Sequence, residues 1–178
     1  APLLKRSKVS KPVLVQADST VDEARFLLDL ADANTFIAGV VAWVDLASPD
    51  VGRSLDELSR RSKLVGIRHL IHEEPDDAWM SRDEIIAGLK EVASRDLAYD
   101  LLVRPQHLKY IPSLAERIPN LRLVVDHIAK PLIAQGVMES WADDIAAVAT
   151  VPSIYCKISG MVTEANHSNW HVGHLKPY

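Results

Sequence analysis

The chain has a single cysteine, Cys156, among its 178 residues. One cysteine cannot form an internal disulfide, which excludes a disulfide-stabilised scaffold and is typical of a reducing compartment such as the cytosol. Long apolar runs are also missing, so we expect no membrane-spanning helix, no membrane partner and a cytoplasmic location. Basic residues lie near the start without the apolar stretch of a secretory signal: Lys5, Arg6, Lys8 and Lys11.

An excess of charge of one sign is missing too. Lys and Arg number 20 against 24 Asp and Glu, which gives a formal net charge of -4. This balance provides no basic field for nucleic acid, so we expect no nucleic-acid partner. The composition that is present is globular, 48% hydrophobic and 25% charged, and predicts one domain over residues 1–178 with a sizeable core.

Six short runs rich in apolar and β-branched residues predict strands. They are residues 12–17, 36–44, 64–71, 98–103, 121–126 and 153–159. Five helical patterns alternate with them, at residues 21–33, 52–61, 82–93, 108–117 and 136–149. The pairs Thr20 with Glu23 and Ser81 with Glu84 have the spacing of capping boxes, and Asp50 can cap the second helix.

Alternating strands and helices indicate βα units and therefore a parallel sheet. Two architectures of this class compete. An open doubly wound sheet usually has a glycine-rich phosphate turn after its first strand, but Ala17, Asp18 and Ser19 follow here, and the sequence has no G-x-G-x-x-G. A (β/α)8 TIM-type barrel needs no such turn, and we favour it.

A barrel also predicts polar groups at the carboxyl ends of many strands at once. This sequence has such groups at Gln16, Trp43, Asp45, Arg68, His69, His72, Arg104, Asp126, His127, Lys157 and Ser159. Burying them separately would cost several kcal/mol each unless they were paired. We therefore expect them to converge on one pocket.

Six segments in order carry a resemblance to a known family. They are VLVQA, GVVAWVDL, GIRHLIHEEPDDAW, LLVRP, VVDHIAKP and YCKISGMVTEA. In these segments the chain resembles the amidohydrolase-related lactonases, the group of L-fuconolactonase, L-rhamnonolactonase and 2-pyrone-4,6-dicarboxylate lactonase. The resemblance implies a (β/α)8 barrel that opens with a strand bearing His-x-His and closes with a strand bearing an active-site Asp.

The sequence of residues 1–178 contains no His-x-His and no seventh strand pattern that ends in an Asp. From the resemblance we expect an incomplete barrel, about strands 2 to 7, truncated at both ends. Open strand edges would favour association, so a second copy of the chain is a candidate partner.

The resemblance also implies roles for individual residues. His127 matches the family's strand-end histidine, which polarises the lactone carbonyl or ligates a divalent metal such as zinc. Arg68 and Arg104 are expected to hold a carboxylate or sugar hydroxyls, with ordinary salt bridges as the alternative. His69 follows Arg68 on the opposite strand face, so one of the two is expected to point inward.

Lys157 and Trp43 complete the expected site, and the neighbouring Cys156 is expected to lie outside it. Lys157 is expected to bind an anion or a substrate oxygen, with a lysine extending outward between helices as the alternative. Trp43 is expected to stack on a sugar ring. Cys156 is expected to be a buried structural cysteine.

Two other clusters rank lower. The spacing of His167, His171 and His174 suits zinc, but no fourth ligand completes the set. The acidic run around Pro75, with Glu73, Glu74, Asp76 and Asp77, is interpreted as a solvated loop.

The predicted function is hydrolysis of a sugar-acid lactone or similar cyclic ester by an activated water, with zinc, another divalent metal or no metal. Because the His-x-His and the terminal Asp are missing, whether the chain is an enzyme stays open. The alternative is a noncatalytic barrel remnant, and a second alternative is a related nonoxidative decarboxylase.

Overall fold

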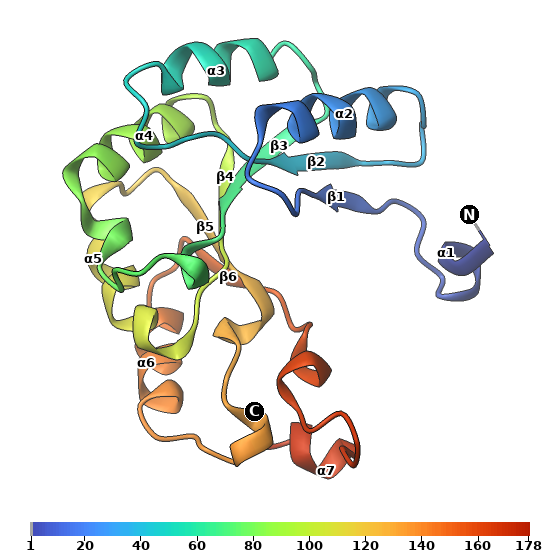
Figure 1. Ribbon diagram of the computed structural model, residues 1–178, viewed down its shortest axis with the longest axis vertical. Helices are drawn as coiled ribbons and strands as arrows, with labels where there is room; N and C mark the ends of the chain where they lie inside the picture. The colour runs from blue at the N-terminus through green and yellow to red at the C-terminus, as the bar shows by residue number, and fades with distance from the viewer. Residues whose placement is uncertain (1) are drawn as a thin grey trace.

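The computed structural model describes residues 2–178 and contains one sheet of six parallel strands in sequence order (Figure 1). The strands are β1 (Val13–Val15), β2 (Gly39–Ala42), β3 (Leu64–His69), β4 (Ala98–Leu101), β5 (Arg122–Val125) and β6 (Ile154–Cys156). Each lies inside one of the six predicted runs, which confirms the predicted parallel βα arrangement.

The helices are α1 (Pro2–Arg6), α2 (Val21–Asp32), α3 (Val51–Leu58), α4 (Asp83–Ser94), α5 (Ile111–Arg117), α6 (Trp141–Ala149) and α7 (Val172–Leu175). The five helices from α2 to α6 alternate with the strands and line the outer side of the curved sheet, whereas α1 precedes β1 and α7 follows β6 (Figure 1). Short 3-10 turns follow the strands or precede the helices, and among them are Ile71–Glu73, Trp79–Ser81, Pro105–Tyr110, Asp126–Ala129 and Met161–Glu164.

The register of the strands separates two faces of the sheet. Ile67 pairs with Tyr99, and Tyr99 pairs with Leu123; all three are fully buried in the apolar core. The next residues along the strands, Arg68 and Asp100, pair with each other and therefore point to the opposite face. The apolar core thus lies between the sheet and its helices, and the inner face of the sheet carries charge.

The first predicted capping box is half formed. Thr20 Oγ1 accepts a hydrogen bond from the backbone N–H of Glu23 at 3.2 Å, as predicted. The Glu23 carboxylate accepts from the backbone N–H groups of Ala17 and Asp18 instead of from that of Thr20. It therefore fixes the turn between β1 and α2 rather than closing the box.

The other two predicted caps are wrong. Ser81 belongs to a 3-10 turn, so α4 begins at Asp83. Its N-cap residue is Arg82, whose side chain makes no capping hydrogen bond. Asp50 stands directly before α3 but makes no capping hydrogen bond, and its carboxylate lies 3.4 Å from Arg53 instead. The helix predicted at residues 136–149 is α6, which begins only at Trp141. Gly136 adopts a left-handed conformation and ends the preceding 3-10 turn, so it does not start the helix.

Candidate active site

Four charged side chains meet on the inner face at the carboxyl ends of neighbouring strands. Arg68 Nη1 lies 3.1 Å from Asp126 Oδ2, and Lys157 Nζ lies 2.7 Å from Asp126 Oδ1. Lys157 also pairs with Asp100. The side chains of Asp126 and Asp100 are only 1% and 3% exposed, whereas that of Lys157 is 34% exposed. This network of two cations and two carboxylates ties β3, β4, β5 and β6 together, with its carboxylates buried and its lysine reaching solvent.

Burial and pairing act in opposite directions within the network. Burial raises the pKa of Asp100 above its ordinary value, although the hydrogen bond from Lys157 opposes the shift. Burial lowers the pKa of Lys157, but its hydrogen bonds to Asp100 and Asp126 outweigh that effect, and its pKa is raised. Lys157 therefore stays charged at neutral pH. Its side chain points to the inner face of the sheet and does not extend outward between the helices.

Gln16 connects this network to the first two strands. Its side-chain Oε1 accepts from the Trp43 backbone N–H at 2.8 Å, and its Nε2 donates to the carbonyl oxygens of Asp18 and Thr20. The backbone carbonyl of Gln16 accepts from Arg68 Nη2. Hydrogen bonds of Gln16 thereby connect the ends of β1, β2 and β3.

His127 follows β5 directly, beside this network. Its Nδ1 lies 2.8 Å from Ser159 Oγ. Burial is the main cause that lowers the pKa of the His127 imidazole below its usual value, and the nearby Lys130 and Arg68 act in the same direction. The ring is therefore neutral at pH 7, the state in which a histidine accepts a proton or ligates a metal.

His69 lies in a different environment from Arg68. Its Nδ1 accepts a hydrogen bond from Trp43 Nε1 at 3.0 Å, its Nε2 lies 2.7 Å from Glu74 Oε1, and Trp79 stacks on the ring at 4.1 Å. Because Trp43 is only a donor, Nδ1 must carry no proton, and Nε2–H donates to Glu74, so both ring nitrogens of His69 are occupied. Arg68, which contacts Asp126, is the inward-pointing member of the pair.

Arg104 follows β4 and is half-buried. Its backbone N–H donates to Nδ1 of the buried His107 at 3.0 Å. Within residues 2–178, its guanidinium makes no ion pair, in contrast to that of Arg68. The substrate-binding roles of Trp43, Arg68, His69, Arg104 and Lys157 stay predictions, and of these five only Arg68 and Lys157 share a carboxylate partner.

Three expectations need correction or refinement. Cys156 is exposed rather than buried, because β6 is the outermost strand of the described sheet. The acidic run is not merely solvated, since Glu74 pairs with His69 and Asp76 with Arg82, and Asp77 Oδ1 lies 3.4 Å from Nε2 of His107. Of the three histidines near residue 170, His171 and His174 lie together, with ring centroids 3.7 Å apart. They are not part of a group of three or more metal-ligating side chains among the described residues.

Sequence reasoning missed Asp100, Glu74 and Trp79. The available signal for Asp100 was a carboxylate inside an otherwise apolar strand. Glu74 and Trp79 carry no such signal, because their contacts depend on the path of the loop between β3 and α4.

A divalent metal in a protein requires several free N, O or S ligands around one point. His127 is a suitable donor, but the two nearby carboxylates of Asp100 and Asp126 are already neutralised by cations. No group of three or more metal-ligating side chains is present among residues 2–178. The described residues do not form a complete metal site on their own.

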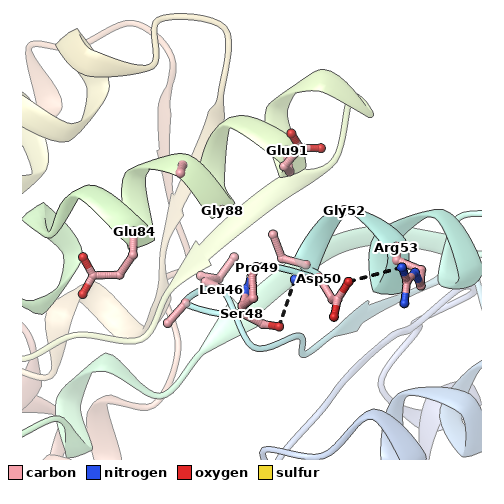
Figure 2. Close-up of a pocket in the computed structure, with 12 residues that line it drawn as sticks. Leu46, Ser48, Pro49, Asp50, Gly52, Arg53, Glu84, Gly88 and Glu91 are labelled. Carbon is pink, nitrogen blue, oxygen red and sulfur yellow. Dashed lines mark hydrogen bonds and ion pairs between the residues drawn. The ribbon is translucent and has the colours of Figure 1, made fainter.

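A surface groove lies elsewhere, between the β2–α3 connection and α4 (Figure 2). Glu84 and Glu91 border it from α4, and Asp50 and Arg53 border it from the start of α3 (Figure 2). It contains none of the expected site residues, and it lies in the helical layer rather than on the inner face of the sheet.

With this geometry in place, comparison with known proteins defines the class of protein. The amidohydrolase family model (Amidohydro_2) matches residues 1–178. An L-fucono-1,5-lactonase of Burkholderia ambifaria is 42% identical over 164 residues, which cover 92% of this chain and 57% of that protein. A second L-fucono-1,5-lactonase, from Burkholderia multivorans, is 33% identical over 171 residues, 93% of this chain and 57% of that protein.

Solved structures agree. A crystal structure of an amidohydrolase from Burkholderia multivorans with bound zinc superposes with a TM-score of 0.92 at 32% identity, covering 99% of this chain and 63% of that one. A probable 2-pyrone-4,6-dicarboxylic acid hydrolase from Acinetobacter baumannii shares the fold, with a TM-score of 0.75 at 19% identity, covering 98% of this chain and 63% of that one. The chain belongs to the amidohydrolase family, and its sheet is a partial TIM-type barrel, as the sequence predicted.

The chain spans little more than half the length of these lactonases. No helix among the described residues is both long and apolar enough to cross a membrane.

Proposed function

We propose that this chain carries the active-site residues of a lactonase that opens the ring of a sugar-acid lactone with an activated water, and that residues 1–178 act as one domain. The observation that carries the proposal is the placement of His127 beside Arg68, Asp126 and Lys157, in a chain 42% identical to an L-fucono-1,5-lactonase.

Ring opening needs a water activated near the carbonyl carbon, a donor for the carbonyl oxygen and an acid for the departing alkoxide. His127, neutral at pH 7, is assigned to accept or return a proton at its free Nε2. Lys157 stays cationic between its two carboxylates and is assigned to donate a hydrogen bond to a substrate oxygen.

The remaining contacts position the sugar acid. Arg104, whose guanidinium has no ion-pair partner among residues 2–178, is assigned to hold a carboxylate or hydroxyl groups of the substrate. Trp43 is assigned to present its ring to the sugar, fixed by its bond to His69. Arg68 is already bound to Asp126 and Gln16, so its expected contribution is to orient Asp126 as well as to contact substrate.

Zinc is retained as a candidate cofactor because a relative was crystallised with it, with His127 as the candidate ligand. Since the described residues do not complete a metal site, no step of the proposed reaction passes through a metal.

The proposal is tested by following acid release from L-fucono-1,5-lactone and other aldonolactones, after subtraction of spontaneous hydrolysis. Parallel samples contain a chelator or added zinc. Turnover above the spontaneous rate is expected for at least one 1,5-lactone. A protein that melts cooperatively but gives no acid release would favour the noncatalytic alternative, and release of carbon dioxide from an acidic substrate would favour the decarboxylase.

A further inference from the structure

His127 begins a left-handed turn of four residues. The φ angles of His127, Ile128, Ala129 and Lys130 are 55, 47, 60 and 51°. For residues other than glycine, this conformation costs roughly 1–2 kcal/mol per residue, and a β-branched residue such as Ile128 is especially crowded in it. A turn of this kind persists only where its surroundings fix it, and such strain is concentrated at functional sites.

The surroundings fix this turn through β6 and α6. The Ile128 backbone N–H donates to the Lys157 carbonyl oxygen at 3.2 Å, and Trp141 Nε1 donates to the Ile128 carbonyl oxygen at 2.8 Å. Ile128 and Ala129 are buried. The backbone of His127 is therefore anchored where β6 ends.

The imidazole of His127 packs directly on the backbone of Gly160. A Cβ atom at position 160 would lie 2.7 Å from His127 Cγ and 2.9 Å from His127 Nδ1, closer than real Cβ atoms approach other atoms. Gly160 also has a φ of +66°, which a residue with a side chain rarely adopts. Only glycine leaves room for the ring in this position.

Ser159 completes the support of the ring. Its Oγ lies 2.8 Å from His127 Nδ1, and a hydroxyl can either donate to that nitrogen or accept from it, so the bond survives in either tautomer. Within residues 2–178, Nε2 of the ring has no hydrogen-bond partner. Nε2 is thus the nitrogen left free to meet a reacting group.

We propose that Ser159 and Gly160 are positioning residues, which hold the His127 ring through Nδ1 and present Nε2 to the substrate. This inference rests on the proposed lactonase function. It also gives a physical reason for the joint occurrence of the DHIAKP and CKISG segments: the histidine of the first lies on the serine and glycine of the second.

The test compares Ser159→Ala with Ser159→Thr, which keeps the hydroxyl at an exposed position. Ser168→Ala, at another exposed serine, is the matched control. Two quantities are measured: kcat for the lactone, and the 15N chemical shifts of the His127 ring in labelled protein, assigned by their loss in His127→Ala.

Ser159→Ala is expected to shift the Nδ1 resonance and to lower kcat about tenfold, the factor that corresponds to one hydrogen bond of about 1.4 kcal/mol, with little change in KM. Ser159→Thr is expected to restore both quantities, and Ser168→Ala to change neither. Gly160→Ala is expected to displace the ring resonances as well, where that variant folds.

Unchanged His127 ring shifts in Ser159→Ala would overturn the inference, and so would failure of Ser159→Thr to restore the shifts. Absence of turnover in the unmodified protein would instead contradict the proposed function. The ring shifts would still decide whether Ser159 positions His127.

Discussion

At the scale of single residues, the fully buried Asp126 lies between two cations, Arg68 and Lys157. Without the Asp126 charge, Arg68 loses its ion-pair partner and Lys157 keeps only Asp100. A buried charge left without compensation costs more than the pair itself contributes. The Asp126 carboxylate is therefore expected to contribute to the stability of the folded protein.

Asp126→Asn is expected to lower the free energy of unfolding by about 3 kcal/mol, because it leaves two cations facing a neutral amide. Urea denaturation measures the change. Asp83→Asn makes the same substitution at a 95% exposed carboxylate paired with Arg117, and it should change the free energy by less than about 1 kcal/mol. Equal losses in the two variants would contradict this account of the network.

Arg104 provides a second prediction for a single residue. Because its guanidinium has no ion-pair partner within residues 2–178, Arg104→Ala should cost little stability but lower kcat/KM for the lactone about tenfold, mainly through KM. Arg53→Ala, at an exposed arginine paired with Asp50, is the control. A melting temperature that falls sharply while KM is unchanged would show that Arg104 acts in folding rather than in binding.

The sequence predicted part of this site and missed part. Arg68, Lys157 and His127 were predicted because they end apolar runs, a pattern that is visible locally. The pairing of Lys157 with Asp100 joins residues 57 positions apart, and the bond between Trp43 and His69 depends on how two strand ends meet. Such pairings are set by barrel geometry, which local patterns do not contain.

At the scale of elements, strands were better predicted than helix starts. Each strand is a compact run of β-formers, and its position follows from that composition. Helix starts differ because 3-10 turns intervene, as at Trp79–Ser81 before α4 and Pro105–Tyr110 before α5. The predicted capping signals at Ser81 and Asp50 are overridden by those turns and by an alternative ion pair.

One packing contact between elements gives a test. A Cβ atom on Gly88 of α4 would lie 2.3 Å from the Leu46 carbonyl oxygen, so α4 approaches the β2–α3 connection at a glycine (Figure 2). Gly88→Ala is expected to destabilise the protein, since the backbone of the β2–α3 connection must move, at a cost of up to about 3 kcal/mol. The gain of about 1 kcal/mol in helix propensity offsets only part of that cost.

Gly52→Ala in α3 is the matched control, because the added Cβ would meet only the ends of flexible side chains, Glu91 Oε2 at 3.2 Å and Arg95 Nη2 at 3.6 Å. It should be neutral or stabilising. Thermal melts of the two variants measure the difference, and a stabilised Gly88→Ala protein would contradict the close approach described for α4.

At the scale of the whole molecule, the chain is a six-stranded part of a barrel with two chemically different faces. The outer face is covered by helices and forms the apolar core, and the inner face gathers the charged residues. β1 and β6 are the outermost strands of the described sheet, and association of the chain with a second copy stays a prediction.

The stability of the molecule should depend on pH through its buried His107. Burial is the largest cause that lowers the pKa of His107 below its ordinary 6.5. The charge of Asp77 and the hydrogen bond with the Arg104 backbone oppose this shift, and the positive charges of Arg104 and Lys109 add to it. The unfolded chain therefore binds the proton first as the pH falls. The stabilisation is complete above pH 6.5 and is lost as the pH falls from 6.5 through the folded-state pKa.

His107→Asn removes this titration while its amide oxygen can still accept from the Arg104 backbone N–H. Melting temperatures between pH 7.5 and 5.5 are expected to fall less steeply in this variant than in the unmodified protein. His167→Asn, at an exposed histidine, should keep the original slope. Parallel curves for His107→Asn and the unmodified protein would contradict the assignment.

His127, held beyond the carboxyl end of β5, is the residue that we propose carries out the chemistry of lactone opening. The most direct test is kcat/KM for L-fucono-1,5-lactone in the unmodified protein, in His127→Ala and in the exposed control His167→Ala. We predict a loss of at least about 100-fold in His127→Ala, the contribution typical of a general acid–base group, and a change of less than about twofold in His167→Ala. Undiminished hydrolysis in His127→Ala would contradict the account.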